Sequence, residues 1–398
     1  MSLLEHVALA PADPILGLSD AFNADDRPDK VNLGVGVYLD EKGRLPLMEC
    51  VRDAERRLAD AGKPHSYLGI DGLPAYVRLV RELVFGAEDH AVQEGRIATA
   101  QALGGTGALK VGADLIASLT PGVTVLISEP SWENHRAIFT RAGFEVGSYR
   151  YYDASTRGID FTGMVQDLEA AAPGTVVVLH ACCHNPTGCD LTDAQWDDVV
   201  RIIAERGLIP FLDMAYQGFG AGVEEDGAAI GKFVAAGIPL FVSTSFSKSF
   251  GLYGERVGAL HIVCRDADEA RRTLSQVKVC IRTNYSNPAT HGAVIVADIL
   301  GDPARRAMWE QELGHMRQRI KALRSKLVEA LRVEGVEDMD FITDQVGMFS
   351  YSGLTREQMQ ALRRDHAVYG TDAGRMCVAA LNDGNLLRVA RAIAAIRR

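Results

Sequence analysis

The sequence predicts an α/β protein: a large domain with a mainly parallel sheet covered by helices, and a smaller α/β domain. Two observations support this. From about residue 95 to 265, short apolar runs alternate with helix-like stretches, a pattern typical of parallel strands buried on both faces. After about residue 303 the alternation stops and a long amphipathic helix begins.

Each element of the first part follows from a local pattern. Apolar residues at helical spacing predict helices, and short runs rich in Val, Ile, Leu and Phe predict strands. The segment 31–38, VNLGVGVY, predicts a short strand or extended segment before the main alternation. We expect helices at 50–61, 107–119 and 194–207, and strands at 123–130, 176–183, 208–213, 239–247 and 259–264.

The C-terminal part has a different composition of elements. Residues 308–335 have apolar side chains at helix spacing, and residues 348–353 predict a short strand. Two helical stretches follow, with the strand-like RMCVAA between them. We therefore expect a large domain at 45–310 and a smaller unit made of the arm 1–44 and residues 311–398.

Composition excludes several classes of protein. The formal net charge of -10 argues against nucleic acid or an anionic membrane as the main partner. The N-terminus has no basic region before an apolar run, and no stretch approaches the about 20 apolar residues of a membrane span. Seven cysteines without a secretory signal favour a reducing, cytoplasmic location over a disulfide framework.

A glycine loop precedes the helix predicted at 107–119. Gly104, Gly105 and Thr106 open that helix, so free backbone N–H groups and the helix dipole face one point and favour a phosphate. The alternative is a tight turn with a threonine cap. The loop lacks the spacing of a Walker motif, and GVGVY at 34–38 lacks the third glycine of a dinucleotide fingerprint.

A second polar segment, HNPTG, follows the strand predicted at 176–183 and contains Asn185. Asn-Pro and Thr-Gly are ordinary turn formers, so a simple β-turn is the alternative. Cys182, Cys183 and His184 precede it, but adjacent cysteines without a second pair do not have the spacing of a metal site. We therefore predict no metal.

Two further strand ends have reactive side chains. Asp213 ends one strand and Tyr216 follows it, while Lys248 follows another. Taken singly, Asp213 is typical of a turn or cap and Lys248 of a solvated lysine. Because reactive groups gather beyond the carboxyl ends of parallel strands, the coincidence of four such ends favours one shared site.

Together these ends supply a phosphate site, a carboxylate, a phenol, an amide and an amine, the set that pyridoxal phosphate requires. The Lys248 amine can form a Schiff base, and Asp213 can keep the pyridine nitrogen protonated. Tyr216 and Asn185 can hydrogen-bond the ring oxygen. Three more residues are expected beside the phosphate: Ser245, Ser247 and Arg256.

Along nearly its whole length, the sequence resembles the class I (fold type I) aminotransferases of the aspartate and aromatic amino acid group. The motifs VNLGVGVY, YLGIDG, GGTGAL, PSWENH, CCHNPTG, DMAYQGF, SFSKSFGLYGERVG, NYSNP and GMFSYSGL occur in the family's order. The resemblance implies a seven-stranded sheet, pyridoxal 5'-phosphate as cofactor, and a homodimer with shared active sites.

The resemblance also implies roles for single residues. Lys248 is then the Schiff-base lysine and the base that moves the substrate Cα proton. Arg375 grips the substrate α-carboxylate through a bidentate fork. The remaining implied contacts are Trp132 stacked on the ring, His135 and His180 supporting it, Tyr67 on the partner subunit's phosphate, Arg282 and Ser286 selecting substrate across the dimer, and Gly36 in the closing segment.

Without the resemblance, simpler interpretations apply to several of these residues. Trp132 is then a core residue, and Arg375 and Arg282 are arginines in surface ion pairs. For His135 and His180 a hydrogen-bonded interior histidine remains an open alternative.

Departures from the family pattern concern substrate choice. Aspartate-preferring members commonly have Lys and Thr in the segment after VGVY, and Asn before the tyrosine of YLGIDG. This chain has Leu39, Leu45 and Ser66 there, which makes the entrance less polar and favours aromatic side chains. We expect transfer of the amino group from tyrosine or phenylalanine, and from aspartate, to 2-oxoglutarate by a ping-pong mechanism.

Three alternatives remain from the sequence. The first is a strict aspartate aminotransferase, since Arg282 is retained. The second is a pyridoxal phosphate-dependent lyase or decarboxylase. The third, a non-enzymatic binding protein on the same fold, is disfavoured because such a protein would be expected to lose Lys248, Asp213 and Arg375.

Overall fold

A computed structural model describes residues 2–10, 16–64 and 66–397 of the chain. The chain divides into two compact units. The smaller unit contains residues 1–45, 322–344 and 348–398, and the larger contains 46–321 and 345–347. The division at 321/322 falls inside helix α12 (Pro303–Val333), whereas the predicted domain boundary at 310/311 lies earlier in the same helix. The predicted domain ranges stay a prediction.

The larger unit contains a seven-stranded sheet in the order β2-β10-β9-β8-β7-β3-β4. Only β10 runs antiparallel to its neighbours, so the prediction of a mainly parallel sheet is confirmed. The strands are β2 (Ile97–Leu103), β3 (Thr124–Glu129), β4 (Glu145–Arg150), β7 (Val176–His180), β8 (Ile209–Met214), β9 (Leu240–Ser245) and β10 (Val257–Val263).

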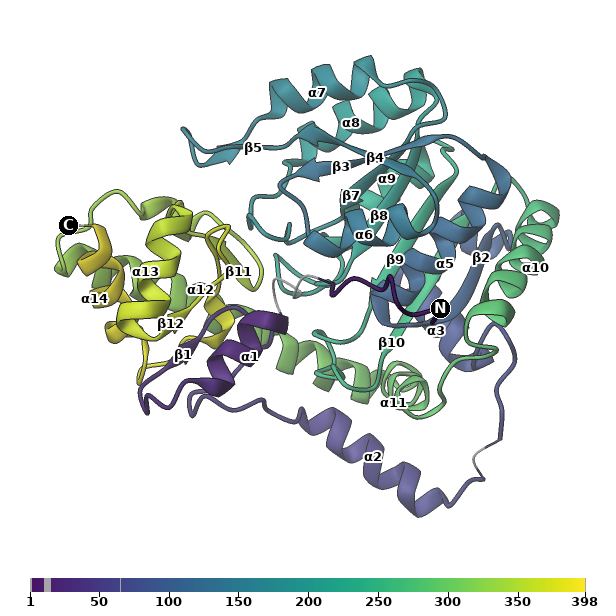
Figure 1. Ribbon diagram of the computed structural model, residues 1–398. Coiled ribbons are helices and arrows are strands. Elements are labelled where there is room, and N and C mark those ends of the chain that lie inside the picture. The colour runs from purple at the N-terminus through teal and green to yellow at the C-terminus, as the bar shows by residue number, and fades with distance from the viewer. Residues whose placement is uncertain (1, 11–15, 65, 398) are drawn as a thin grey trace. The chain divides into compact units, whose positions relative to one another are not determined.

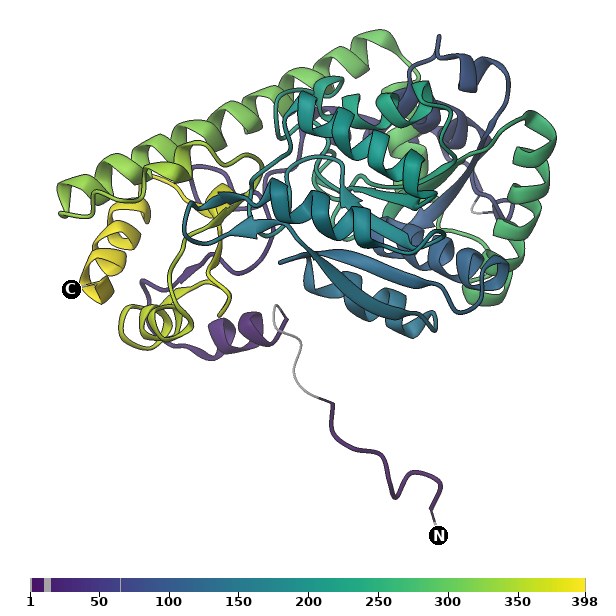
Figure 2. The same ribbon diagram turned by 90° about the horizontal axis from the view of Figure 1, so that it is seen from above.

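Helices cover both faces of this sheet (Figures 1 and 2). The central one, α5 (Gly104–Leu119), packs on β2, β9 and β10 and belongs to the main apolar core. It approaches the sheet closely at Gly112, where an added Cβ would lie 2.6 Å from the Phe211 ring. The other helices of this unit, apart from α12, are α2 (Glu49–Ala61), α3 (Pro74–Phe85), α4 (His90–Gln93), α6 (Glu133–Arg141), α7 (Phe161–Ala170), α8 (Asp193–Arg206), α9 (Ala228–Ala235), α10 (Ala267–Asn284) and α11 (His291–Leu300).

Two predicted strands end earlier than expected, each for a local reason. The strand predicted at 176–183 stops at His180, and Cys183 has a φ of 51°, which no strand accommodates. The strand predicted at 239–247 stops at Ser245, and the chain then turns through Ser247. The polar residues after these strands therefore lie on turns at the sheet edge.

The smaller unit contains two short two-stranded sheets. Strand β1 (Val31–Asn32) pairs in parallel with β12 (Val368–Tyr369), and β11 (Phe349–Tyr351) pairs antiparallel with β13 (Arg375–Cys377). In the segment 31–38, predicted as a short strand or extended segment, the strand is thus confined to the first two residues. Helices α1 (Leu16–Ala24), α13 (Arg356–His366) and α14 (Leu386–Arg397) complete this unit. Among the described residues, no helix combines the length and apolarity needed to span a bilayer.

Candidate active site

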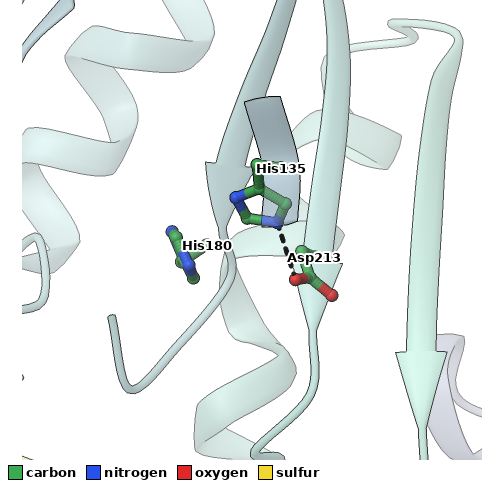
Figure 3. A group of neighbouring side chains, drawn as sticks. All are labelled: His135, His180 and Asp213. Carbon is green, nitrogen blue, oxygen red and sulfur yellow. Dashed lines mark hydrogen bonds and ion pairs between the residues drawn. The ribbon is translucent and has the colours of Figure 1, made fainter. Parts of the chain in front are cut away.

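The centre of the candidate site is Asp213 on β8, a carboxylate only 5% exposed. His135 on α6 lies with its Nε2 3.0 Å from Asp213 Oδ2, and its Nδ1 lies 2.9 Å from Ser131 Oγ (Figure 3). Burial alone would raise the pKa of Asp213, but the hydrogen bond from His135 and the nearby positive charges lower it overall. An ionised Asp213 requires His135 to donate through Nε2, and the bond between Nδ1 and the Ser131 hydroxyl holds the ring in place.

The second oxygen of Asp213 is buried and remains open to a further partner. Among the residues that the structure describes, none donates a hydrogen bond to Asp213 Oδ1 or to either ring nitrogen of His180. The His180 ring lies beside that of His135, with centroids 5.0 Å apart (Figure 3). Burial lowers the pKa of His180 to about 3, so its ring is neutral. A buried ionised oxygen without a donor is costly, which indicates that a donor from outside the chain belongs there.

Lys248 lies three residues beyond the end of β9 and is partly buried. Its Nζ is 4.8 Å from the centroid of the Tyr216 ring. The Tyr216 hydroxyl in turn accepts a 3.5 Å hydrogen bond from Asn185 Nδ2. The structure therefore brings the predicted amine, phenol and amide together, and the solvated lysine of the simpler interpretation does not describe this position.

The predicted phosphate site is compact. Arg256 Nη1 donates to Ser247 Oγ at 3.1 Å, and Ser247 Oγ lies 3.2 Å from Ser245 Oγ. The Arg256 guanidinium lies over the first turn of α5: a Cβ on Gly104 would be 2.5 Å from Nη2. A Cβ on Gly105 would likewise be 3.2 Å from Ser245.

Backbone geometry supports a functional constraint at this site. Arg256 has a φ of 54°, an unusual conformation for a residue with a side chain and one that often accompanies binding sites. Thr106 lies in the first turn of α5 and is partly buried. Free N–H groups, two hydroxyls and a guanidinium thus surround one point, as an oxyanion requires.

Three other predicted residues lie toward the surface of the larger unit. Tyr67 is 91% exposed, in the connection between α2 and α3. Arg282 occupies the last turn of α10 and donates to the hydroxyl of Ser286, whose φ is 71°. Within the described parts of the chain, no hydrogen bond or ion pair joins these side chains to Asp213.

Trp132 is partly buried at the start of α6, packed against the main core and edge-on to His135 at 5.3 Å. Both the core interpretation and a place beside a bound ring are compatible with this position.

Arg375 and Gly36 belong to the smaller unit. Arg375 is 1% exposed, which rules out the exposed ion pair of the simpler interpretation. Its Nη2 donates to the carbonyl oxygen of Gly34 at 2.8 Å, and its guanidinium carbon lies 4.4 Å from the centroid of the Phe349 ring.

Comparison with known proteins identifies the family. The sequence model described as aminotransferase class I and II matches residues 28–393. The chain belongs to this family. It is 55% identical to the aspartate aminotransferase of Pseudomonas aeruginosa and 48% identical to the aromatic-amino-acid aminotransferase of Escherichia coli, covering 99% of this chain and 99% or more of each relative.

The solved structures agree. The aromatic-amino-acid aminotransferase of Burkholderia pseudomallei, covalently bound to pyridoxal phosphate, superimposes with a TM-score of 0.98 at 59% identity, over 100% of both chains. The predicted family, the fold and the transaminase class are therefore confirmed, and the predicted cofactor is the one bound in that relative.

The residues of this aminotransferase fit the cofactor. A protonated pyridine nitrogen is a donor of the kind that Asp213 Oδ1 lacks among the described residues.

The metal alternative fits less well. His135, His180 and Asp213 form one group with ligand atoms within 4.8 Å of one another, and Cys182, Cys183 and Asp226 form another. In both groups the carboxylate already accepts hydrogen bonds, from His135 or from backbone N–H groups. That no metal is used stays a prediction.

The aminotransferase site has supporting residues that the sequence interpretation missed. Asp190 is partly buried and accepts from the backbone N–H of Cys183 and His184 at 2.6 and 2.8 Å, which fixes the turn before Asn185. The His184 ring is held between the hydroxyls of Ser128 and Thr187. Ser131 has a usable signal, its position four residues before His135. Asp190 and Ser128 have no such signal. Asp190 bonds to backbone atoms, and Ser128 bonds to the ring of His184, which is distant in the sequence.

Proposed function

We propose that the chain is a pyridoxal phosphate-dependent aminotransferase that transfers the amino group of tyrosine or phenylalanine, and of aspartate, to 2-oxoglutarate by a ping-pong mechanism. The observation that supports it most is Oδ1 of Asp213, which has no donor among the described residues. His135 keeps this carboxylate ionised through Oδ2, and Oδ1 is left to hold the pyridine nitrogen in its protonated form.

The other residues at the sheet edge hold the cofactor. Tyr216 and Asn185, already in contact with each other, hydrogen-bond the ring oxygen. The phosphate is held by the first turn of α5 and the cluster beside it: Gly104, Gly105, Thr106, Ser245, Ser247 and Arg256. Trp132 would stack on the pyridine ring of the cofactor. His180 would support the site through its contact with the His135 ring.

Lys248 acts on the substrate. When bound, the cofactor supplies an electron sink and carries the amino group between the two halves of the reaction. The Lys248 amine would hold the cofactor in the resting enzyme, and it would serve as the base that removes the proton from the substrate Cα. Its place over the Tyr216 ring, 4.8 Å from the centroid, restricts where the amine can lie. Such positioned proton transfer contributes about 10²–10⁴-fold to a rate.

Substrate recognition involves residues of the smaller unit and of a second subunit. Arg375 binds the α-carboxylate, and Gly36 lies in the segment that closes over substrate. In a homodimer, Tyr67 serves the partner's phosphate, and Arg282 with Ser286 serves the partner's substrate. The exposure of Tyr67 and Arg282 supports this, because both side chains are available to a second subunit at the surface of a single chain. A cytoplasmic location, and independence of nucleic acid and membranes, stay predictions from the sequence.

The second candidate is a strict aspartate aminotransferase. It is favoured by the retained Arg282 and by the 55% identity to a relative of that name. The aromatic preference rests on the apolar Leu39 and Leu45, where aspartate-preferring members have polar residues.

A panel of half-reactions distinguishes these candidates. Purified holoenzyme is mixed with phenylalanine, tyrosine or aspartate alone, and the absorbance of the cofactor is followed before and after 2-oxoglutarate is added. We expect each amino acid to convert the cofactor, 2-oxoglutarate to reverse the change, and kcat/KM for phenylalanine to exceed that for aspartate. A higher value for aspartate supports the second candidate, and release of carbon dioxide supports a decarboxylase.

The variant Asp213→Asn tests the residue on which the proposal rests. Because the amide cannot balance a protonated ring nitrogen, we expect the half-reaction to slow by about 10²-fold or more. Bound cofactor, measured by its absorbance after gel filtration, should persist through the phosphate site. An unchanged rate contradicts the role of Asp213.

A further inference from the structure

Arg375 is held by a small sheet of the smaller unit. Strands β13 and β11 are antiparallel, with Tyr351 opposite Arg375 and Phe349 opposite Cys377. The backbone N–H of Arg375 donates to Thr371 Oγ1 at 3.2 Å, and its Nη2 donates to Gly34 O at 2.8 Å. These bonds hold the backbone and one end of the guanidinium.

The Phe349 ring gives the guanidinium a flat surface to pack on. Phe349 is 3% exposed, and its ring centroid is 4.4 Å from the guanidinium carbon of Arg375. A guanidinium over an aromatic face is attracted by the ring quadrupole, and more strongly where water is excluded, as here. The backbone of Phe349 is itself held in place, since its carbonyl accepts from the buried Arg324.

Gly36 provides the space that this ring occupies. A Cβ at position 36 would lie 2.7 Å from Phe349 Cζ and 3.3 Å from Cε1, closer than packed carbons approach. Any larger residue there has to displace the ring. The closing segment, the ring and the guanidinium therefore form one packed stack within the smaller unit.

We infer that Phe349 is a positioning residue that orients Arg375 for the substrate carboxylate, and that Gly36 is required because of the Phe349 ring. The physical reason is that a bidentate carboxylate contact needs both outer nitrogens in one defined plane. A guanidinium free to rotate makes one hydrogen bond where an oriented one makes two. The inference rests on the proposed role of Arg375 in binding the α-carboxylate.

Equilibrium binding to the holoenzyme tests this without turnover. The probes are 3-phenylpropionate, an aromatic carboxylate with no amine, and 3-phenylpropanamide, its neutral amide. We expect Phe349→Leu to weaken binding of the carboxylate by about tenfold and binding of the amide by about twofold or less. Phe349→His, which keeps a flat aromatic face and adds no atom at the Cζ position beside Gly36, should retain more carboxylate binding than Phe349→Leu. In kinetics, Phe349→Leu should raise KM for amino acids more than it lowers kcat.

Phe22→Leu is a matched control, because Lys30 Nζ lies 4.6 Å from the Phe22 ring centroid in the same unit. It removes an aromatic partner of a cation that is not Arg375, and we expect no change in either probe. An equal loss in this variant would show a general effect of aromatic packing and would overturn the inference.

Gly36→Ala extends the test to a variant that retains the ring, should Phe349→Leu fold poorly. We expect it to weaken carboxylate binding severalfold, and to add little in the Phe349→Leu background, because both act through the same ring. Full additivity would overturn the role assigned to Gly36.

Arg375→Lys distinguishes the role of Arg375 in carboxylate binding from the role of Phe349 in positioning it. If it weakens carboxylate binding and Phe349→Leu does not, the proposed function stands and the positioning role is wrong. If carboxylate binding does not depend on Arg375 at all, the proposed function is wrong on that point.

Discussion

Two groups of predicted site residues in the larger unit differ in nearly every structural respect. Around Asp213, the side chains are buried, come from the ends of neighbouring strands, and contact one another. Tyr67 and Arg282, by contrast, are exposed and lie outside the sheet. The first group is assembled by folding of one chain, whereas in the proposed homodimer the second group acts on the site of the partner subunit.

Mutations in the two groups should therefore affect catalytic activity in different ways. Under the proposed function, a residue of the buried group acts on the reacting atoms in its own chain, so its loss should affect every substrate. A residue of the exposed group would act on part of the substrate in the other subunit, so its loss should depend on the substrate and on the partner.

The largest effect is expected for Lys248→Ala. Removing the amine removes both the cofactor anchor and the base at the substrate Cα, so kcat should fall by about 10⁴-fold or more for phenylalanine and aspartate alike. Steady-state transamination with each donor measures this.

Lys110→Ala is the control lysine. It lies on α5, just beyond the phosphate site, but its Nζ pairs with Asp114 instead. We expect kcat within about twofold of the wild type, since partly exposed ion pairs contribute little. Residual activity of Lys248→Ala near the wild-type level would remove Lys248 from the mechanism.

Much of the buried group was predictable because its logic is local. Apolar runs place the strands, and the residue after each run lies at the sheet edge, so Asp213, Asn185 and Lys248 follow from patterning alone. Their partners did not follow. Asp190 accepts hydrogen bonds from backbone atoms, and Arg375 packs on Phe349, a contact across a strand pair of the smaller unit.

The exposed group was predictable only by resemblance. No period or spacing distinguishes Tyr67 or Arg282 from an ordinary surface residue, because the role proposed for them depends on another subunit. The segment 31–38 was predicted as a short strand or an extended segment, and only Val31 and Asn32 pair with β12.

The second prediction concerns Asp190, which supports the buried group, and its effect on the free energy of unfolding. Burial raises the pKa of Asp190 to about 6, against the two backbone N–H bonds that lower it, with Asp226 raising it further. A folded-state pKa above the unfolded value of 3.8 means that this group favours folding most below about pH 4. That contribution is lost as the pH rises through 6, a change of about 3 kcal/mol.

Asp190→Asn cannot titrate, so it should abolish this term. The free energy of unfolding, measured by denaturant titration, should favour the wild type over the variant more at pH 4 than at pH 8. The variant should also lose stability at every pH, because one backbone N–H loses its acceptor oxygen, at about 1–3 kcal/mol. A difference that is flat between pH 4 and 8 would show that folding does not raise the pKa of Asp190.

The smallest effect, and the most direct test of the comparison, concerns Arg282→Ala. Removing a charged donor from the distal carboxylate should lower kcat/KM for aspartate by about tenfold and leave kcat/KM for phenylalanine nearly unchanged.

Co-expression with Lys248→Ala then tests which subunit's site Arg282 serves. In a random mixture about half of the dimers contain both variants, and each of these has one wild-type site if Arg282 acts across the interface. Activity toward aspartate should then reach about a quarter of wild type, whereas action within one chain leaves about a twentieth. The lower value would place Arg282 beside its own Lys248 and remove the distinction between the two groups.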